Sequence, residues 1–169
     1  KHKKMKKLLL LLVLISTIGC NQNEKKIPHS HNAITSIKLH QELPEIVHLD
    51  LEIEGNSHGD LMAFDSDFTN DKGMMGILSG YITTVDIQNE TKTFEDRMVH
   101  MVFDFGEANT IVIGGKSEYP KILGAEFKKQ IPQIRAVIGG TGDYMGARGQ
   151  LTTTRNEDGT YEHLIELMD

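Results

Sequence analysis

Apolar and polar residues alternate with a period of two along most of the chain after Ala33, and this pattern limits what the chain can fold into. The segment Ile46–Glu54 is the clearest case, because its apolar residues alternate with His48, Asp50 and Glu52. A β-strand sends successive side chains to opposite faces, whereas a helix repeats every ~3.6 residues. The pattern therefore predicts strands, and this one has an apolar face and a polar face.

Eight further segments show strand patterns. They are Ile34–His40, Asp60–Phe68, Gly76–Ile87, Phe94–Phe105, Thr110–Ile113, Gln133–Ile138, Arg148–Arg155 and Tyr161–Met168. Short runs rich in Gly, Asn and Asp separate most of them, as tight turns require. The segment Gly115–Pro132 is the exception and predicts a longer loop. No helix of three turns is expected after residue 32.

Eight or nine strands joined by short turns predict an all-β fold whose antiparallel strands follow the sequence order. Such a sheet must hide its edges, either by closing on itself or by pairing with another sheet. We expect an eight-stranded antiparallel up-and-down β-barrel over residues 33–169, with a β-sandwich as the alternative. A barrel of eight strands has a lumen that its own side chains can fill or that holds one small ligand. The 169 residues suffice for one such domain.

The first 20 residues carry a different signal. Five lysines precede Leu8, residues 8–15 are uninterruptedly apolar, and Thr-Ile-Gly-Cys ends the segment at Cys20. The apolar run is shorter than the ~20 residues that span a bilayer, so it predicts a secretory signal. The ending resembles the lipobox of bacterial lipoproteins, in which the cysteine is diacylated and becomes the first residue after cleavage. This resemblance implies a lipoprotein signal peptide at 1–19 and a lipidated Cys20 with a flexible polar tether over 20–32.

Cys20 is the only cysteine of the chain, so no disulfide can form and its thiol has no partner within the chain. Acyl chains such as palmitate would hold the protein stably on a membrane, since each buried CH₂ contributes about 0.8 kcal/mol. The expected location is the bacterial cell envelope, and Asn21 after the cysteine is compatible with the outer membrane of a Gram-negative host. The alternative is an ordinary cleaved signal with a chance cysteine beside the cut.

Charge and motifs exclude several classes of partner. The net charge is −6, and a chain that begins at Cys20 carries 13 basic and 24 acidic residues, because five lysines lie before it. An acidic surface repels phosphate backbones, so nucleic acid is excluded as a partner. His29 and His31 form an H-x-H pair without a third ligand nearby, and we interpret them as solvated tether residues rather than a metal site. No NAD, flavin, haem or nucleotide signature is present, so no cofactor is expected.

The segment Ile138–Gly149 contains a glycine-rich motif, which consists of Gly139, Gly140, Thr141, Gly142, Gly146 and Gly149. Glycines in this pattern allow positive φ angles or close backbone approach at a sharp bend. The motif resembles the G-G-T-G-x-[YF]-x-x-A-R-G signature of plant dirigent proteins and a similar run in allene oxide cyclases. Gly59–Phe64 is similar to the G-D-L-x-x-F segment of the cyclases. The resemblance implies an eight-stranded barrel, usually trimeric, with an apolar cavity for a small organic ligand.

Five residues are ligand-binding candidates, because they are polar side chains on strands or turns of the predicted barrel: Asp50, Tyr81, Arg97, Asp143 and Arg148. Asp143 and Arg148 flank one turn, where they can form either a structural ion pair or an acid and an anion holder for a ligand. A buried tyrosine such as Tyr81 commonly needs only one ordinary partner. Catalytic residues are not assigned.

Three function classes remain. The main hypothesis is a membrane-anchored envelope lipoprotein whose barrel binds or orients a small apolar or phenolic ligand without catalysis, as dirigent proteins do. The alternative is an isomerase or cyclase that acts on a small hydrophobic substrate in the lumen. The third is a structural envelope protein with a filled barrel, and a cavity of about 300 Å³ or more would argue against it. Apolar residues on both faces of Arg97–Phe105, together with the resemblance, predict a homotrimer.

Overall fold

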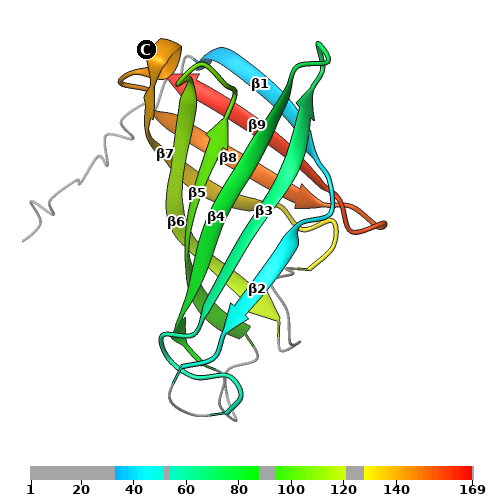
Figure 1. Ribbon diagram of the computed structural model, residues 1–169, viewed down its shortest axis with the longest axis vertical. Coiled ribbons are helices and arrows are strands. Elements are labelled where there is room, and N and C mark those ends of the chain that lie inside the picture. The colour runs from blue at the N-terminus through cyan, green and yellow to red at the C-terminus, as the bar shows by residue number, and fades with distance from the viewer. Residues whose placement is uncertain (1–32, 52–53, 88–93, 121–127, 169) are drawn as a thin grey trace, which may run out of the picture. The chain divides into compact units, whose positions relative to one another are not determined.

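A computed structural model of the chain describes residues 33–51, 54–87, 94–120 and 128–168. The signal peptide, Cys20 and the tether that we expect at residues 1–32 lie outside the described residues. Nine antiparallel strands make up most of the described chain (Figure 1): β1 (Ala33–Gln41), β2 (Glu45–Leu49), β3 (Leu61–Asn70), β4 (Met75–Asp86), β5 (Phe94–Asp104), β6 (Thr110–Pro120), β7 (Gln133–Thr141), β8 (Gly149–Arg155) and β9 (Tyr161–Met168).

The strands β3 to β9 follow one another in sequence order around a barrel, and β1 closes it. On one side of β1, Ile37 pairs with Ile165 of β9, and on the other side Gln41 pairs with Phe68 of β3. The predicted eight-stranded antiparallel barrel is therefore confirmed, and the β-sandwich alternative is wrong. β2 is an additional strand, which pairs with the first half of β3.

Alternation along β5 shows how the sequence sorts its side chains between lumen and surface. Glu95, Arg97 and Val99 point inward and are buried, and so are the next two residues of this face, whereas Met98 between them is 47% exposed. The inward apolar side chains gather at the end of the barrel that carries the β3–β4 and β5–β6 turns. There the rings of Phe68 and Phe103 meet edge to face with centroids 5.5 Å apart. This end is filled, so any space for a ligand lies toward the other end.

The glycine-rich motif lies at the filled end, where it forms the end of β7 and the short 3-10 turn η1 (Gly142–Tyr144). The positive φ that we predict at a sharp bend is confirmed for Gly142, whose φ is 58°. A Cβ on Gly140 would lie 2.5 Å from the carbonyl oxygen of Tyr144, so close approach explains this glycine. Asn109 Oδ1 accepts a hydrogen bond of 2.8 Å from Asp143 N, which ties η1 to the β5–β6 turn.

The predicted long loop Gly115–Pro132 is wrong in its first part, because β6 continues to Pro120. β6 pairs with β5 over its whole length, from Thr110 opposite Asp104 to Pro120 opposite Phe94. The two adjacent glycines at 114 and 115 interrupt the hydropathy pattern without interrupting the ladder of backbone hydrogen bonds. Ser117 and Tyr119 beyond them are buried inward, so the strand keeps its alternation.

The predicted strand Ile46–Glu54 is also shorter than expected, because β2 ends at Leu49. Side-chain hydrogen bonds replace the strand ladder from Asp50 onward. Asp50 Oδ2 accepts a hydrogen bond of 3.0 Å from Gly55 N, and Asp60 Oδ1 accepts one of 3.0 Å from Leu51 N. Such carboxylate-to-backbone bonds favour turns over extended pairing. None of the described residues belongs to a helix that is long and apolar enough to span a bilayer.

Candidate functional site

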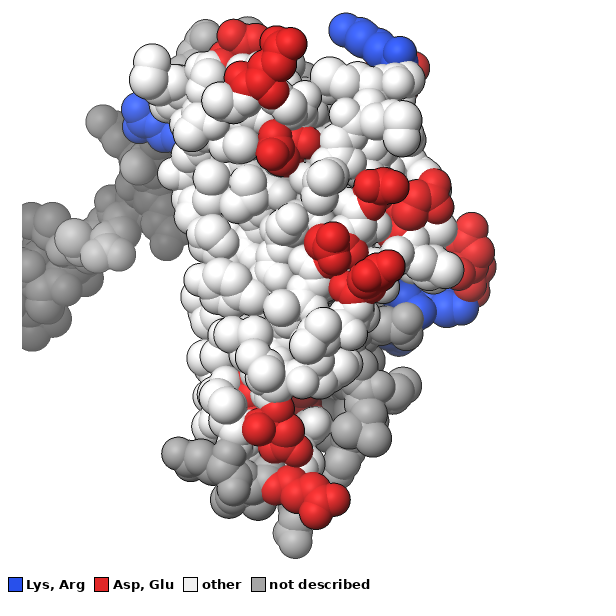
Figure 2. All heavy atoms as spheres, viewed as in Figure 1, with Lys and Arg blue, Asp and Glu red and all other residues white. Residues whose placement is uncertain are grey.

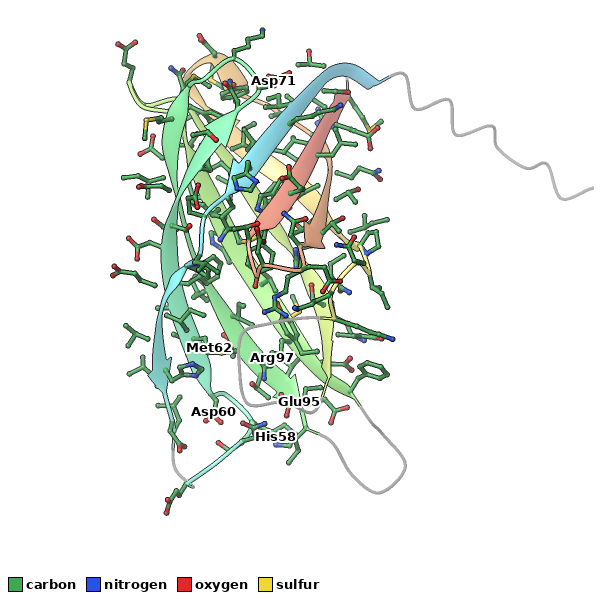
Figure 3. The ribbon with its side chains drawn as sticks, turned by 90° about the vertical axis from the view of Figure 1, so that its right-hand side faces the viewer. His58, Asp60, Met62, Asp71, Glu95 and Arg97 are labelled. Carbon is green, nitrogen blue, oxygen red and sulfur yellow. The ribbon has the colours of Figure 1, made fainter. Side chains whose placement is uncertain are left out.

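A cavity of about 250 Å³ opens at the end of the barrel opposite the glycine motif, and we call it the mouth cavity. Its lining includes His48, Asp50, Asn56, Asp60, Met62 and Arg97. Figure 3 shows Asp60, Met62, Glu95 and Arg97 gathered at this end, whereas Asp71 of the β3–β4 turn lies at the other. β2, β3, β4 and β5 supply its inward strand residues, and the loop between β2 and β3 supplies the rest.

The carboxylate of Asp60 organises the loop at the rim of the mouth cavity. It accepts hydrogen bonds from Leu51 N at 3.0 Å, from Ser57 N at 2.6 Å and from the Ser57 hydroxyl at 2.7 Å. Desolvation raises the pKa of Asp60, but these hydrogen bonds and the positive charge of Arg97 outweigh it and hold the pKa below its usual value. Asp60 is therefore ionised at neutral pH and acts as the fixed centre of this loop.

Arg97 and Glu95 form a buried ion pair beside the mouth cavity. Glu95 Oε2 lies 2.6 Å from Arg97 Nη2 and 3.1 Å from Arg97 Nε, and both side chains are almost fully buried. Asn56 donates a hydrogen bond from its side-chain amide to the other carboxylate oxygen of Glu95, which links the rim loop to the pair. The guanidinium carbon of Arg97 also lies 4.6 Å from the centroid of the Tyr119 ring. The pair thus connects the rim to the interior of the barrel.

A second, smaller cavity of about 40 Å³ lies deeper in the barrel, and we call it the lumen cavity. One wall of it is apolar and comes from β2 to β5, through Ile46, Phe64, Ile82, Val99 and Met101. The other wall is polar and comes from β6 to β9 and β1, through Tyr119, Arg135, Thr153, Tyr161, His163 and Gln41. The interior of the barrel thus has an apolar side and a polar side, and the space between them is much smaller than the ~300 Å³ of small-molecule pockets.

A chain of hydrogen bonds crosses the polar wall. Arg135 Nη1 donates to Thr153 Oγ1 at 3.3 Å, Thr153 Oγ1 lies 2.9 Å from His163 Nδ1, and His163 Nε2 lies 2.8 Å from Gln41 Oε1. A guanidinium can only donate and the amide oxygen of Gln41 can only accept, so Thr153 Oγ1 accepts from Arg135 and the neutral His163 ring donates from Nε2. This leaves Nδ1 to accept from the Thr153 hydroxyl. The proton of the His163 ring is then on Nε2, from which it donates to Gln41. Both ring nitrogens are engaged.

Burial controls the ionisation of this wall. It lowers the pKa of His163 to about 3, with a further lowering from the charge of Arg135, so the ring is neutral at physiological pH. Burial also raises the pKa of Tyr119, although the charges of Arg135 and Arg97 and a hydrogen bond with Arg135 oppose it. Arg135 itself has a pKa lowered by burial and stays charged, as arginine does in proteins. Arg135 Nε donates to Ser117 Oγ at 2.8 Å, which fixes its orientation.

Of the five predicted ligand-binding residues, two line the mouth cavity or the lumen cavity. Asp50 and Arg97 both line the mouth cavity. Tyr81 lies on the outer face of β4, is 45% exposed and stacks on His100 with ring centroids 5.2 Å apart. Asp143 and Arg148 are exposed at the filled end, and no ion pair joins them in the described chain. Neither of these two lines the mouth or the lumen cavity.

Sequence reasoning missed Glu95, Tyr119, Arg135 and His163. The period-two pattern could have identified Glu95, because this residue shares the inward face of its strand with Arg97. Arg135 could not be predicted as an inward residue, because Ile134 and Ile138 indicate that the opposite face of β7 faces the core. In the structure these two isoleucines are 62% and 56% exposed. No group of three or more His, Cys, Asp or Glu side chains in the described ranges is placed to hold a metal ion.

Comparison with known proteins gives a likeness of fold. No protein-family model matches the chain, and no curated protein matches it in sequence. Pyocyanin demethylase has a similar structure, with a TM-score of 0.61 and 19% identity over 79% of this chain and 100% of that one. A nonspecific haem-binding cyclase, which catalyses a 4 + 2 cycloaddition during neoabyssomicin biosynthesis, gives a TM-score of 0.56 and 17% identity over 80% of this chain and 64% of that one, less than two thirds of its length.

The Diels–Alderase AbmU from Streptomyces koyangensis gives a TM-score of 0.55 and 14% identity over 80% of this chain and 68% of that one. At these identities the likeness establishes the barrel and not the activity. The allene oxide cyclase and dirigent resemblance of the glycine motif agrees with the barrel but is not established as kinship by any of these matches.

Proposed function

We propose that this barrel takes a small, largely apolar molecule with oxygen substituents into its interior and acts on it as a cyclase or isomerase. The observation that carries the proposal is the two-sided lumen cavity. Burial against the apolar wall supplies affinity, and the donors of the polar wall orient the oxygens of the ligand. Structures of the same fold include pyocyanin demethylase, a nonspecific haem-binding cyclase and a Diels–Alderase, which supports this class of function.

Catalysis in such a site would come from confinement and fixed electrostatics. Confinement in the lumen would restrict the conformers of the substrate and shield a reactive intermediate from water. Arg135, with the phenol of Tyr119 beside it, would stabilise negative charge that develops on a substrate oxygen. Isomerisation and cyclisation conserve the atoms of the substrate, so the reaction needs no co-reactant.

The state of His163 favours a second candidate, a non-enzymatic binder that only holds or orients its ligand. Both ring nitrogens are engaged and its pKa is about 3, so His163 is a poor general base. The lumen cavity of about 40 Å³ also favours the third candidate, a filled structural barrel, whereas the mouth cavity of about 250 Å³ approaches the ~300 Å³ of small-molecule pockets.

One experiment separates the three functions. The purified full chain is analysed by native mass spectrometry for a copurified ligand, and the ligand is then incubated with fresh protein. A chromatographic shift at unchanged mass is the expected result, because a cyclase or isomerase rearranges its substrate without changing its mass. A ligand that binds and returns unaltered supports the binder. A chain that carries no ligand, and takes up none from a lipid extract, supports the structural barrel.

The proposal extends to the attachment of the chain. Cys20 is the acyl site, and the protein is held at the bacterial cell envelope, on the outer membrane in a Gram-negative host. The support for this is the sequence of residues 1–20, with its basic start, its short apolar run and its Gly-Cys ending. The tether over residues 20–32 then leads from the membrane to the barrel.

Assembly as a homotrimer is the last part of the proposal. The outer faces of β4 and β5 carry Ile77, Tyr81 and Met98, all of them substantially exposed. Figure 2 shows few charged side chains over this side of the barrel, while acidic side chains gather at its margins. Exposed apolar surface of this kind marks contact sites. Sedimentation velocity of the full chain in detergent at micromolar concentration is expected to give a trimer, and Met98→Glu is expected to give a monomer; a monomeric wild type would contradict this assembly.

A further inference from the structure

Met62 lines the mouth cavity and is paired across the sheet with Ile82, which lines the lumen cavity. Across the barrel wall, Met62 is paired with His48 on β2 and with Ile82 on β4. His48 and Met62 line the mouth cavity, whereas Ile82 lines the lumen cavity. Within this row of paired residues, the boundary between the two cavities therefore lies between Met62 and Ile82.

The next rows on either side confirm the position of this boundary. Phe64, the next inward residue of β3 after Met62, lines the lumen cavity. On β4 and β5, the paired residues Thr84 and Arg97 line the mouth cavity, whereas the next pair inward, Ile82 and Val99, lines the lumen cavity. The two cavities are thus successive layers of one barrel interior, and Met62 lies at the boundary between them.

Met62 has the properties of a movable partition. Its side chain is unbranched and has three rotatable bonds, so it changes shape at little cost. It is buried, and it makes a weak polar contact, with Sδ 3.6 Å from Arg97 Nη1. Losing a contact of this kind costs little, because thioether sulfur is a weak acceptor. Met62 packs within the hydrophobic core, so a ligand that displaces its side chain replaces apolar contacts with apolar contacts of its own.

We propose that the two cavities are the ends of a single ligand site, which opens into one space when Met62 swings aside. This inference rests on the proposed function and specifies its ligand. The ligand is an elongated molecule with a narrow apolar body that passes Met62 and lies against Ile82 and Val99. Its inner end carries a carbonyl, enol or phenol oxygen that meets Thr153 and Arg135, and its outer end lies among the polar residues of the mouth.

Charge at the mouth selects against anions at the outer end. Asp50 and Asp60 are two carboxylates of its lining, while the charge of Arg97 is balanced by Glu95. A molecule that carries a carboxylate or phosphate at its outer end would face two like charges in a partly enclosed space. The outer end of the ligand is therefore neutral, with hydroxyl or amide groups suited to these acceptors.

The test uses the neutral elongated dye N-phenyl-1-naphthylamine, whose fluorescence rises in apolar surroundings, and the full chain in detergent-free buffer after Cys20→Ser. Met62→Ala removes the partition and is expected to tighten dye binding by about fivefold or more, since the dye can then pass the boundary between the cavities and contact the apolar wall of the lumen. Met62→Ile keeps the volume but is stiff at χ1, so it is expected to weaken binding by about fivefold. Met75→Ala is the matched control, because Met75 is 66% exposed on the outer face of β4, and it leaves binding unchanged.

The outcomes distinguish the inference from the function on which it rests. If wild type and both Met62 variants bind the dye equally, Met62 is no partition and the inference is overturned, while the proposed function stands. If neither wild type nor Met62→Ala binds the dye, the proposed function fails and the inference fails with it. Circular dichroism shows whether Met62→Ala is folded; if it is not, weaker binding by the near-isosteric Met62→Ile supports the inference and unchanged binding overturns it.

Discussion

Glu95 and Arg97 stand two residues apart on β5 and form an ion pair inside the barrel, with Arg97 Nη2 at 2.6 Å and Nε at 3.1 Å from the same carboxylate oxygen. The pair has neighbours on three sides: Asn56 of the rim loop, the ring of Tyr119 and the sulfur of Met62. Two charges buried together cost much less than either one alone. The mouth of the barrel therefore depends on both partners being present.

Glu95→Gln tests this dependence with a side chain of nearly the same shape. The change leaves a buried guanidinium without its carboxylate, and we expect the free energy of unfolding to fall by about 3–5 kcal/mol. Urea unfolding at pH 7, followed by circular dichroism, measures it. Glu118→Gln is the control, because Glu118 is exposed on β6, and it is expected to stay within about 0.5 kcal/mol of wild type. Equal midpoints of urea unfolding for Glu95→Gln and wild type would show that the ion pair contributes nothing to the stability of the barrel.

His163 makes the stability of the barrel sensitive to acid. Its pKa is about 3 in the folded chain and about 6.5 in the unfolded chain, so the unfolded state binds the extra proton between these values. Stability is complete above about pH 6.5 and falls as the pH drops toward 3, by up to about 1.4 kcal/mol per pH unit. Urea unfolding at pH 7, 6 and 5 measures the slope, and His163→Asn is expected to flatten it.

His40 provides the control for the pH dependence of stability, because its shifted pKa changes the free energy of unfolding in the opposite direction. The hydrogen bond to Glu162, at 2.6 Å, raises the pKa of His40 above its usual value. The stability that this pair contributes is present at low pH and is lost as the pH rises through the raised pKa. His40→Gln is therefore expected to steepen the loss of stability in acid. A slope unaffected by His163→Asn would place the acid sensitivity elsewhere.

The sequence was sufficient to predict the barrel because period-two alternation and short turns are local signals. Seven of the predicted strands recur within a few residues of the observed ones, and β2 and β6 differ for identifiable reasons. Asp50 and Asp60 end β2 through side-chain hydrogen bonds that hydropathy does not register. In β6, a pair of glycines masked a strand whose pairing with β5 continues to Pro120.

The site was harder to predict because its polar wall contradicts the hydropathy rule. Arg135 faces the lumen although its strand carries the exposed apolar residues Ile134 and Ile138 outside. Periodicity assigns residues to two faces, but only closure of the barrel decides which face is inside. Arg97 lies on the inward face of β5 together with Glu95, Val99 and Met101, whereas Tyr81 lies on the outer face of β4, where apolar strand surface also occurs.

Gly142→Val tests the turn of the glycine motif. A side chain at φ 58° is strained, and its Cβ would collide with the side-chain amide of Asn109. We expect a loss of stability of about 1 kcal/mol or more, visible as a lower midpoint of thermal unfolding. Gly139→Ala is the matched control within the same motif, because Gly139 has no positive φ and nothing lies within 4 Å of its added Cβ. Equal losses in both variants would refute the conformational explanation.

Cys20→Ala tests the anchor. Cys20 is the only cysteine of the chain, so the substitution removes the sole thiol that a lipobox could acylate. We expect the protein to move from the membrane fraction to the soluble fraction after centrifugation of lysed cells, while dye binding by the barrel is unchanged. A variant that remains quantitatively in the membrane fraction would show that something other than acylation of this thiol attaches the chain.

Comparing Arg148→Met with Arg135→Met tests whether the ligand binds at the glycine motif or in the lumen cavity. Arg148 is exposed at the filled end of the barrel, where an ion pair with Asp143 would contribute only about 0–1 kcal/mol, so its loss is expected to leave both stability and ligand binding almost unchanged. Arg135 lines the lumen cavity, where a hydrogen bond from a charged donor to a ligand oxygen contributes about 1.5–3 kcal/mol. Titration of each variant with 1-naphthol, a small apolar phenol, measures the difference, and a thermal melt of each variant shows whether it is folded. If Arg148→Met weakens binding while Arg135→Met does not, the ligand site lies at the glycine motif and the assignment to the lumen is wrong.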